Sequence, residues 1–239
     1  MDGEGQPNQP GALFPPTRWS LVLAARDRPE ERRRALGELV APRWKPLYVL
    51  ARKQGLPPAE AEDAVQSFLA LLVDGDLLSR ADPQRGRLRT FLRTAFHNHL
   101  VNLHEHAGAM KRGGGQRGVA LEDVEALVAA PGPSPEAQFE RAWALAIFEE
   151  ALAALEGEFA AGERRGPFSV VRALFRFGEA PSYAELGAEI GMTVPQLKSF
   201  VHRAKGRFRQ LLRARVADTL EPGDDLDAEV AALLEALGS

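Results

Sequence analysis

The chain has 239 residues, of which 45% are hydrophobic and 26% charged, and it contains no cysteine. This composition is typical of globular proteins, and the length predicts one large or two small domains. Without cysteine, disulfides, thiolate metal sites and cysteine nucleophiles are excluded. No apolar run approaches the roughly 18 residues of a membrane span, and the polar N-terminus is unlike a secretory signal. We therefore expect a cytoplasmic protein without membrane contact.

The net charge of -3 conceals two basic regions and an acidic one. Residues 218–239 carry seven acidic side chains and no basic one. Residues 195–215 carry seven Lys or Arg and no acid, and residues 85–117 carry seven against Glu105 alone. Two separated basic regions predict two contacts with a polyanion, although many basic helices are simply solvated surfaces. For the acidic segment two roles are open: folding back on a basic region, or docking on a partner.

Apolar residues recur at three- and four-residue steps and do not alternate, which predicts an all-α protein. Within one predicted helix this spacing indicates burial of Ala61, Val65, Phe68, Leu69 and Leu72. Pro42 and Pro46 are expected to bend or interrupt another. In chain order the predicted helices are a short one after Pro15-Pro16-Thr17 and then 29–54, 59–73, 88–109, 121–128, 135–160, 167–177, two around a turn at 191–192, and 226–237.

The glycines and prolines between Lys111 and Pro135 indicate a flexible linker that joins two helical domains. The predicted division lists an N-terminal extension 1–28, a domain 29–110, the linker 111–134, a domain 135–217 and an acidic extension 218–239.

The most specific motif is a predicted helix-turn-helix in the second domain. Its two helices open with the capping boxes Ser182-x-x-Glu185 and Thr193-x-x-Gln196. Gly187 would let the helices cross closely, and Gly191 would adopt the positive φ of the turn. The alternative is a plain helical hairpin within a bundle, which would require neither glycine.

Polar side chains near the start of the second helix are those that a recognition helix turns toward base edges in the major groove. Basic residues further along the helix would meet phosphates. The predicted duplex contacts are Gln196, Lys198, Ser199, His202, Arg203, Lys205 and Arg207, with Arg209 beyond them.

Two stretches of the first domain carry a resemblance to a known family. Asp63-Ala64-Val65-Gln66-Ser67-Phe68 precedes the basic, aromatic stretch Phe91-Leu92-Arg93-Thr94-Ala95-Phe96-His97-Asn98. Together with the helix-turn-helix, these motifs resemble those of bacterial RNA polymerase sigma factors of the extracytoplasmic-function group. The resemblance covers roughly residues 30–110 and 135–215. Residues 15–20 and the acidic segment resemble the extensions of a subset of that group.

The resemblance implies that 29–110 is the sigma region 2 domain, which binds core RNA polymerase and melts promoter DNA. It implies that 135–217 is the region 4 domain, a helix-turn-helix related to the winged helix but without a sheet. An anti-sigma protein is a further candidate partner. By the same resemblance core polymerase would contact Asp63, Gln66 and Phe68, and the single-stranded −10 promoter element would contact Arg89, Arg93, His97, Asn98 and Asn102. The helix from Val194 would read the double-stranded −35 element.

The chain departs from the family pattern at three places. Leu69 stands where Phe is usual, Asn102 where Asp is usual, and the basic run that normally follows is reduced to His104-Glu105-His106. These departures bear on which upstream sequence is recognised and not on the fold.

No motif predicts catalysis, a cofactor or a metal. The four histidines between His97 and His106 include no pair at i, i+4, and their i, i+7 pairs are about 10 Å apart along a helix. We therefore expect a binding protein and not an enzyme. Two alternatives to a sigma factor stay open: a stand-alone helix-turn-helix regulator, and a helical adaptor or RNA-binding protein.

Overall fold

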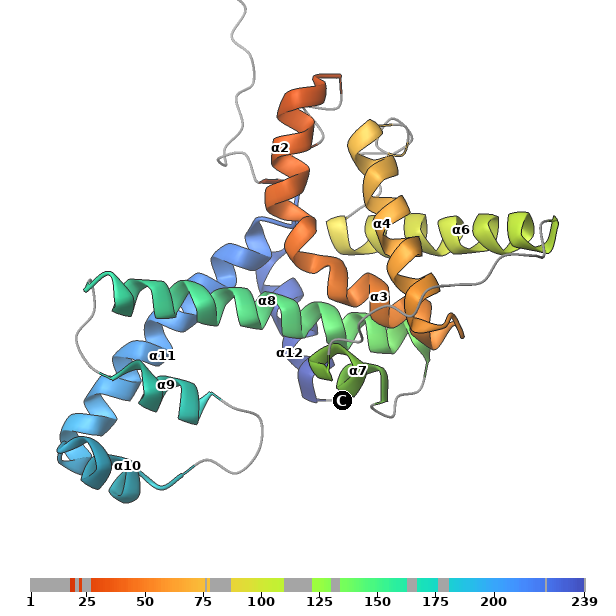
Figure 1. The fold of residues 1–239 in the computed structure, drawn as a ribbon. Coiled ribbons are helices and arrows are strands. Elements are labelled where there is room, and N and C mark those ends of the chain that lie inside the picture. Colours follow the sequence, from red (N-terminus) through yellow and green to blue (C-terminus); the bar gives the residue numbers. More distant parts are fainter. Residues whose placement is uncertain are drawn as a thin grey trace, which may run out of the picture. The chain divides into compact units, whose positions relative to one another are not determined.

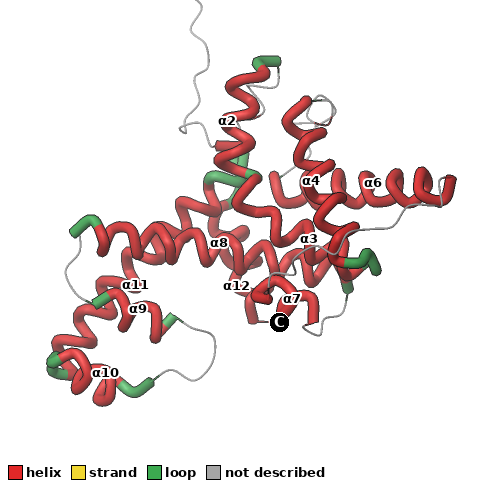
Figure 2. Tube along the Cα trace, in the orientation of Figure 1, coloured by secondary structure: helices red, strands yellow, loops and turns green. Residues whose placement is uncertain are grey.

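The structure, a computed structural model, describes residues 18, 19, 22, 27–75, 77, 87–109, 122–129, 134–162, 167–175, 181–221 and 223–238. Within these ranges every regular element is a helix, which confirms the predicted all-α class (Figures 1 and 2). Most of the predicted linker lies outside them.

The chain separates into two compact units. The first comprises residues 1–144 together with 217–239, and the second comprises residues 145–216. The divisions fall inside two long helices, α8 (Pro135–Ala160) and α11 (Val194–Ala217). The acidic C-terminal segment therefore belongs to the first unit.

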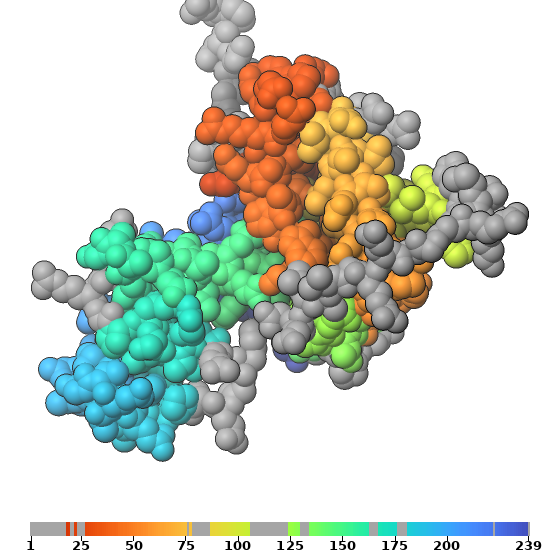
Figure 3. All heavy atoms as spheres, viewed as in Figure 1, coloured from red at the N-terminus to blue at the C-terminus, as the bar shows by residue number. Residues whose placement is uncertain are grey.

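The described helices of the first unit are α2 (Pro29–Leu39), η1 (Ala41–Arg43), α3 (Trp44–Lys53), α4 (Pro58–Asp74), α6 (Leu88–Ala109), α7 (Glu122–Ala129), the start of α8, and α12 (Leu226–Gly238). Helix α4 packs against α2, α3 and α6, and its side chains meet those of α2 in Figure 3. The predicted helix 29–54 is interrupted at Pro42, which lies in the short 3-10 turn η1. Pro46 lies in the first turn of α3, where a backbone N–H would have no partner within the helix.

Helices α4 and α6 bury their apolar residues at helical spacing. The buried set of α6 includes Leu88, Leu92 and Phe96, one turn apart. Phe96 packs edge to face against Phe68 of α4, with ring centroids 5.0 Å apart. These residues define the face of α6 that packs on the core, and its polar residues His97, Asn98 and Asn102 are exposed.

Segments from both ends of the chain meet at the start of α6. The ring of Trp19 lies 5.5 Å from that of Phe91. The backbone N–H of Trp19 donates to the carbonyl of Asp218 at 3.0 Å, and that of Leu88 donates to the carbonyl of Thr219 at 3.2 Å. The segment that leads into α12 is thus hydrogen-bonded on one side to residue 19 and on the other to α6. Of the short helix predicted after Thr17, only residues 18, 19 and 22 are described, and they are helical.

The second unit contains the rest of α8, α9 (Phe168–Leu174), α10 (Tyr183–Ile190) and most of α11. Phe208 of α11 packs edge to face on Phe148 and on Phe175, at centroid distances of 4.8 and 4.7 Å. Phe159 contacts Phe168 and Phe200 at 5.5 and 5.9 Å. These two aromatic clusters hold one face of α11 inside, and its polar residues therefore lie on the opposite face.

Candidate functional site

The helix pair α10–α11 begins each helix with a reciprocal cap. The backbone N–H of Glu185 donates to the Ser182 hydroxyl at 3.2 Å, and the Ser182 N–H donates to the Glu185 carboxylate at 2.9 Å. Hydrogen bonds that Glu185 accepts from Ser182 lower the pKa of this carboxyl group, with the side-chain hydroxyl contributing most and the backbone N–H next. At α11 the Thr193 N–H donates to Oε1 of Gln196 at 2.9 Å. Both predicted capping boxes are confirmed.

The turn between these helices requires glycine at two positions. Gly191 has φ of 69° and ends α10 in the left-handed conformation. A Cβ added at Gly187 would lie 2.6 Å from the carbonyl oxygen of Met192, and the Met192 N–H donates to the Gly187 carbonyl at 2.9 Å. The predicted positive φ at Gly191 is confirmed. At Gly187 the element that comes close is the backbone of the turn at Met192, which leaves no room for a side chain there.

The face of α11 away from the aromatic clusters carries the predicted polar residues. Gln196 is exposed. Its Oε1 accepts the cap hydrogen bonds of Thr193, so its amide NH2 is the group that a ligand could contact. The exposed predicted residues are Lys198, Ser199, His202, Arg203 and Lys205.

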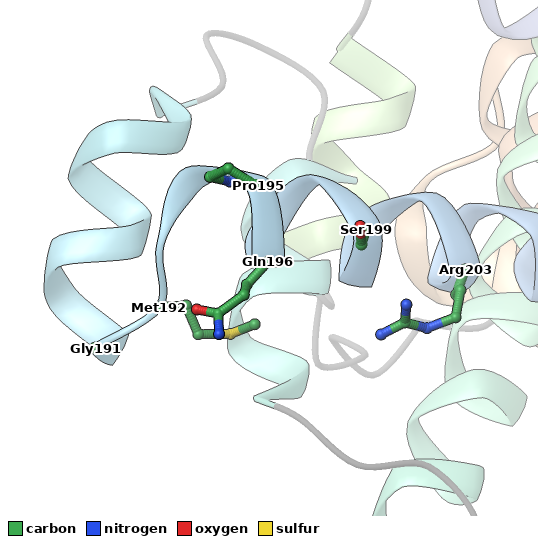
Figure 4. A pocket seen from close by; sticks show the side chains of 6 residues that line it. All are labelled: Gly191, Met192, Pro195, Gln196, Ser199 and Arg203. Atoms are coloured by element: carbon green, nitrogen blue, oxygen red, sulfur yellow. The ribbon is translucent and has the colours of Figure 1, made fainter.

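An open hollow lies beside the turn (Figure 4). In that view Met192 lies next to Gln196, and the guanidinium of Arg203 points back toward the start of α11. The hollow is lined by Gly191, Met192, Pro195, Gln196, Ser199 and Arg203.

Arg207, a predicted phosphate contact further along this helix, is held by a carboxylate, whereas Arg209 is exposed. Nη2 of Arg207 donates to Oε1 of Glu158 on α8 at 2.6 Å, and its Nε donates to Oε1 at 2.9 Å and to Oε2 at 3.2 Å. This bidentate geometry is the one in which guanidinium and carboxylate bind best. The basic face thus consists of an open start and a paired middle.

In the first unit, α4 presents part of the predicted polymerase contact at the surface. Asp63 and Gln66 are exposed on one face of the helix. Phe68 is fully buried against Phe96, as the apolar spacing predicts. The surface available to a partner here is therefore that of Asp63 and Gln66, and Phe68 supports it from the core.

The arginines at the start of α6 are engaged by two carboxylates. Arg89 pairs with Glu140 of α8 at 2.6 Å and with Glu229 of α12 at 3.1 Å. Arg93 pairs with Glu140 at 2.5 Å, and Arg87 pairs with Glu229. The exposed fractions of the Arg89 and Glu229 side chains are 12% and 2%. We call Arg87, Arg89, Arg93, Glu140 and Glu229 the arginine–glutamate cluster.

The other predicted residues of α6 lie outside this cluster. His97 is exposed, with Nδ1 2.9 Å from the Gln54 amide nitrogen, and Asn98 and Asn102 are exposed. His99 is half-buried: its ring lies near those of Phe68 and Phe96, and its Nε2 lies 2.9 Å from the Ser67 hydroxyl. Burial lowers the pKa of His99.

The two glutamates of the cluster were not among the residues predicted to form a site. Glu229 has an indirect signal in the sequence, since residues 218–239 combine a surplus of acids with apolar residues at helical spacing, whereas no pattern singles out Glu140. Neither feature identifies which basic region the segment contacts.

Among the described residues, no group of three or more His, Asp or Glu is arranged to hold a metal. None of the helices described has the length and apolarity required to cross a membrane. No family model matches the sequence, and searches of curated proteins and of solved structures gave no match. The functional assignment therefore depends on the residues and their geometry.

Proposed function

We propose that the chain is a sigma factor, the promoter-specific initiation subunit of bacterial RNA polymerase. In this proposal the Asp63–Gln66 face binds the core enzyme, α6 binds the single-stranded −10 element, and the helix pair α10–α11 acts as a helix-turn-helix that binds the −35 duplex. The observation that carries it is the α10–α11 pair, with a glycine at the close crossing and an acid-free polar face at the start of the second helix.

The start of α11 has the chemistry for reading DNA. A recognition helix contacts base edges with side chains from its N-terminal turns. Arg203 can donate two hydrogen bonds to guanine, while Lys198 and Lys205 can neutralise phosphates. All three are exposed. With Oε1 of Gln196 occupied by the cap, its NH2 would donate to a base acceptor.

The first unit supports the polymerase half of the proposal. Exposed amide and imidazole groups of His97, Asn98 and Asn102 can hydrogen-bond unpaired bases, and arginines can bind the phosphates between them. Binding alone accounts for this role, so the proposal includes no catalytic residue and no cofactor.

The test is reconstitution with core RNA polymerase. The purified chain is expected to co-elute with the core enzyme and to direct transcription from defined start sites on genomic fragments. Asp63→Ala/Gln66→Ala is expected to weaken core binding by about thirtyfold, since two polar contacts at about 1 kcal/mol each are removed. Glu189→Ala, which removes an exposed acidic side chain from α10, is the control.

Failure of the chain to bind the core enzyme would overturn the proposal. The second candidate, a stand-alone helix-turn-helix regulator, is favoured by the open face of α11 taken alone. It predicts sequence-specific duplex binding without polymerase and no effect of the Asp63→Ala/Gln66→Ala change.

A further inference from the structure

We infer that α12 closes a phosphate-binding site formed by Arg87, Arg89 and Arg93, and that Glu229 occupies the position of a nucleic-acid phosphate. This inference rests on the proposed function, because it takes the start of α6 as a surface that binds DNA. It adds a control of that surface by the chain's own C-terminal helix.

Ion pairs and backbone hydrogen bonds hold α12 and the segment before it against the start of α6. Glu229 is 2% exposed although it is a charged residue of a surface helix, and it pairs with both Arg87 and Arg89. Asp218 and Thr219, which precede α12, accept backbone hydrogen bonds from Trp19 and Leu88. These bonds anchor the segment that leads to α12 at the first residue of α6.

A DNA phosphate can replace the Glu229 carboxylate that these arginines bind. Guanidinium groups bind carboxylates and phosphates with the same planar fork of N–H donors. Three guanidiniums here converge on two carboxylates. A phosphate that replaces Glu229 would keep Arg87 and Arg89 paired, so opening the site in the presence of DNA leaves no buried arginine unpaired.

The two carboxylates differ in how firmly the fold holds them. Glu140 lies on α8 between Phe139 and Trp143, both fully buried, so it stays in place whenever the first unit is folded. Helix α12 buries only Glu229 and Leu233, and Leu234 is 52% exposed. Leu226, Val230 and Leu237 are only partly buried, so one fully buried leucine and an ion pair, whose desolvation offsets much of its attraction, hold the helix weakly. Glu229 is therefore the releasable anion.

The test compares four full-length chains: the unchanged sequence, Glu229→Gln, Leu233→Ala and Glu235→Gln. Leu233→Ala loosens α12 without altering charge, whereas Glu235→Gln removes one charge at an exposed position of the same helix. The probe is a fluorescein-labelled single-stranded DNA of about 20 nucleotides, and anisotropy gives its Kd between about 50 and 200 mM NaCl. Circular dichroism and thermal unfolding check that each variant is folded.

Glu229→Gln and Leu233→Ala are expected to bind the probe about tenfold more tightly, because affinity falls with the fraction of molecules whose site is closed. Freeing Arg87 and Arg89 from Glu229 should also steepen the dependence of log Kd on log salt by about 1.4, at roughly 0.7 for each phosphate. Glu235→Gln should stay within about twofold of the unchanged chain. Adding Arg89→Ala to Leu233→Ala should remove most of the gain.

Unchanged affinity in Leu233→Ala, or a gain in Glu229→Gln no larger than that of Glu235→Gln, would overturn the inference. A gain that survives Arg89→Ala would overturn it as well. These outcomes are separable from the proposed function. A chain that directs promoter-specific transcription but shows no gain rejects the closed site alone, whereas a gain without polymerase binding rejects the sigma-factor assignment alone.

Discussion

The two basic regions of this chain have equal numbers of basic residues but differ in what those residues contact. At the start of α6 the guanidiniums of Arg89 and Arg93 are paired with carboxylates from α8 and α12. At the start of α11, Lys198 and Arg203 are exposed, and in the part of the chain that the structure describes neither forms an ion pair. A count of basic residues therefore does not tell which surface is open to a polyanion. Acids supplied from distant parts of the sequence decide it.

The contrast is also present within a single helix. Arg203 and Arg207 lie one turn apart on α11, yet Arg207 is bound bidentately by Glu158 and Arg203 is exposed. Pairing of Arg207 orients α11 on α8 within the second unit. The open residues are those nearest the turn, where a recognition helix would meet DNA.

The largest expected effect is on duplex binding by the open face. Lys198→Ala/Arg203→Ala should weaken binding of promoter duplex by at least about 2 kcal/mol, because an arginine on a base edge contributes about 1–3 kcal/mol and a lysine on phosphate adds to it. Fluorescence anisotropy with labelled duplex measures the change. Arg33→Ala/Arg34→Ala on α2, which removes the same charge from an exposed surface, should have little effect. Equal losses in both variants would mean that net charge alone drives binding.

The second prediction concerns the geometry that presents the open face. Gly187→Ala places a methyl group 2.6 Å from the Met192 carbonyl oxygen, so the turn must shift. We expect a loss of about 1–3 kcal/mol in the free energy of unfolding, as for overpacked cores, and a further loss of duplex affinity. Urea titration measures the stability.

Gly206→Ala on α11 is the control, since no atom lies within 4 Å of its added Cβ. There the exchange should stabilise the helix by about 0.5–1 kcal/mol. A destabilisation equal to that of Gly187→Ala would contradict the close crossing as the cause.

Local features of the fold were predictable, and the difference between the two basic regions was not. A capping box joins residues three positions apart, and the two turn glycines lie in the same short stretch of sequence. The start of α11 can therefore be predicted from the local sequence alone. The helices 88–109 and 135–160 have the predicted bounds, whereas the helix predicted over 167–177 ends at Leu174. The pairing of Arg87 with Glu229 spans 142 positions and depends on tertiary packing. No periodicity reports such a contact.

Phe68 illustrates how two predictions about one residue can differ. The resemblance assigns it to polymerase binding, whereas the apolar spacing of its helix predicts burial, and it is buried. Spacing predicts burial because a helix turns one face to the core. Which exposed residues bind a partner stays a prediction from the resemblance.

A smaller effect is expected at the cap that opens the helix pair. Ser182→Ala removes the acceptor for the Glu185 N–H and should cost about 1 kcal/mol of unfolding free energy. Ser169→Ala, at an exposed position of α9, is the control and should change stability by less than about 0.5 kcal/mol. Since the cap supports the open face, Ser182→Ala should also weaken duplex binding modestly. Unchanged stability would mean that the cap adds nothing to the pair.

The smallest expected effect is a pH dependence of stability that comes from His99, a half-buried residue of α6 outside the arginine–glutamate cluster. His99 packs near Phe68 and Phe96 and contacts Ser67, and its burial holds its pKa below the ordinary 6.5. The unfolded chain therefore binds a proton at a pH where the folded chain does not, so stability is full above about pH 6.5 and falls as pH drops below it. His99→Gln has no such proton to bind.

The unfolding free energies of the unchanged chain and of His99→Gln should therefore be compared from about pH 8 to about pH 5. Their difference should shift in favour of His99→Gln as pH falls, because only the unchanged chain loses stability by protonation at this position. A difference independent of pH would show that His99 tolerates the charge.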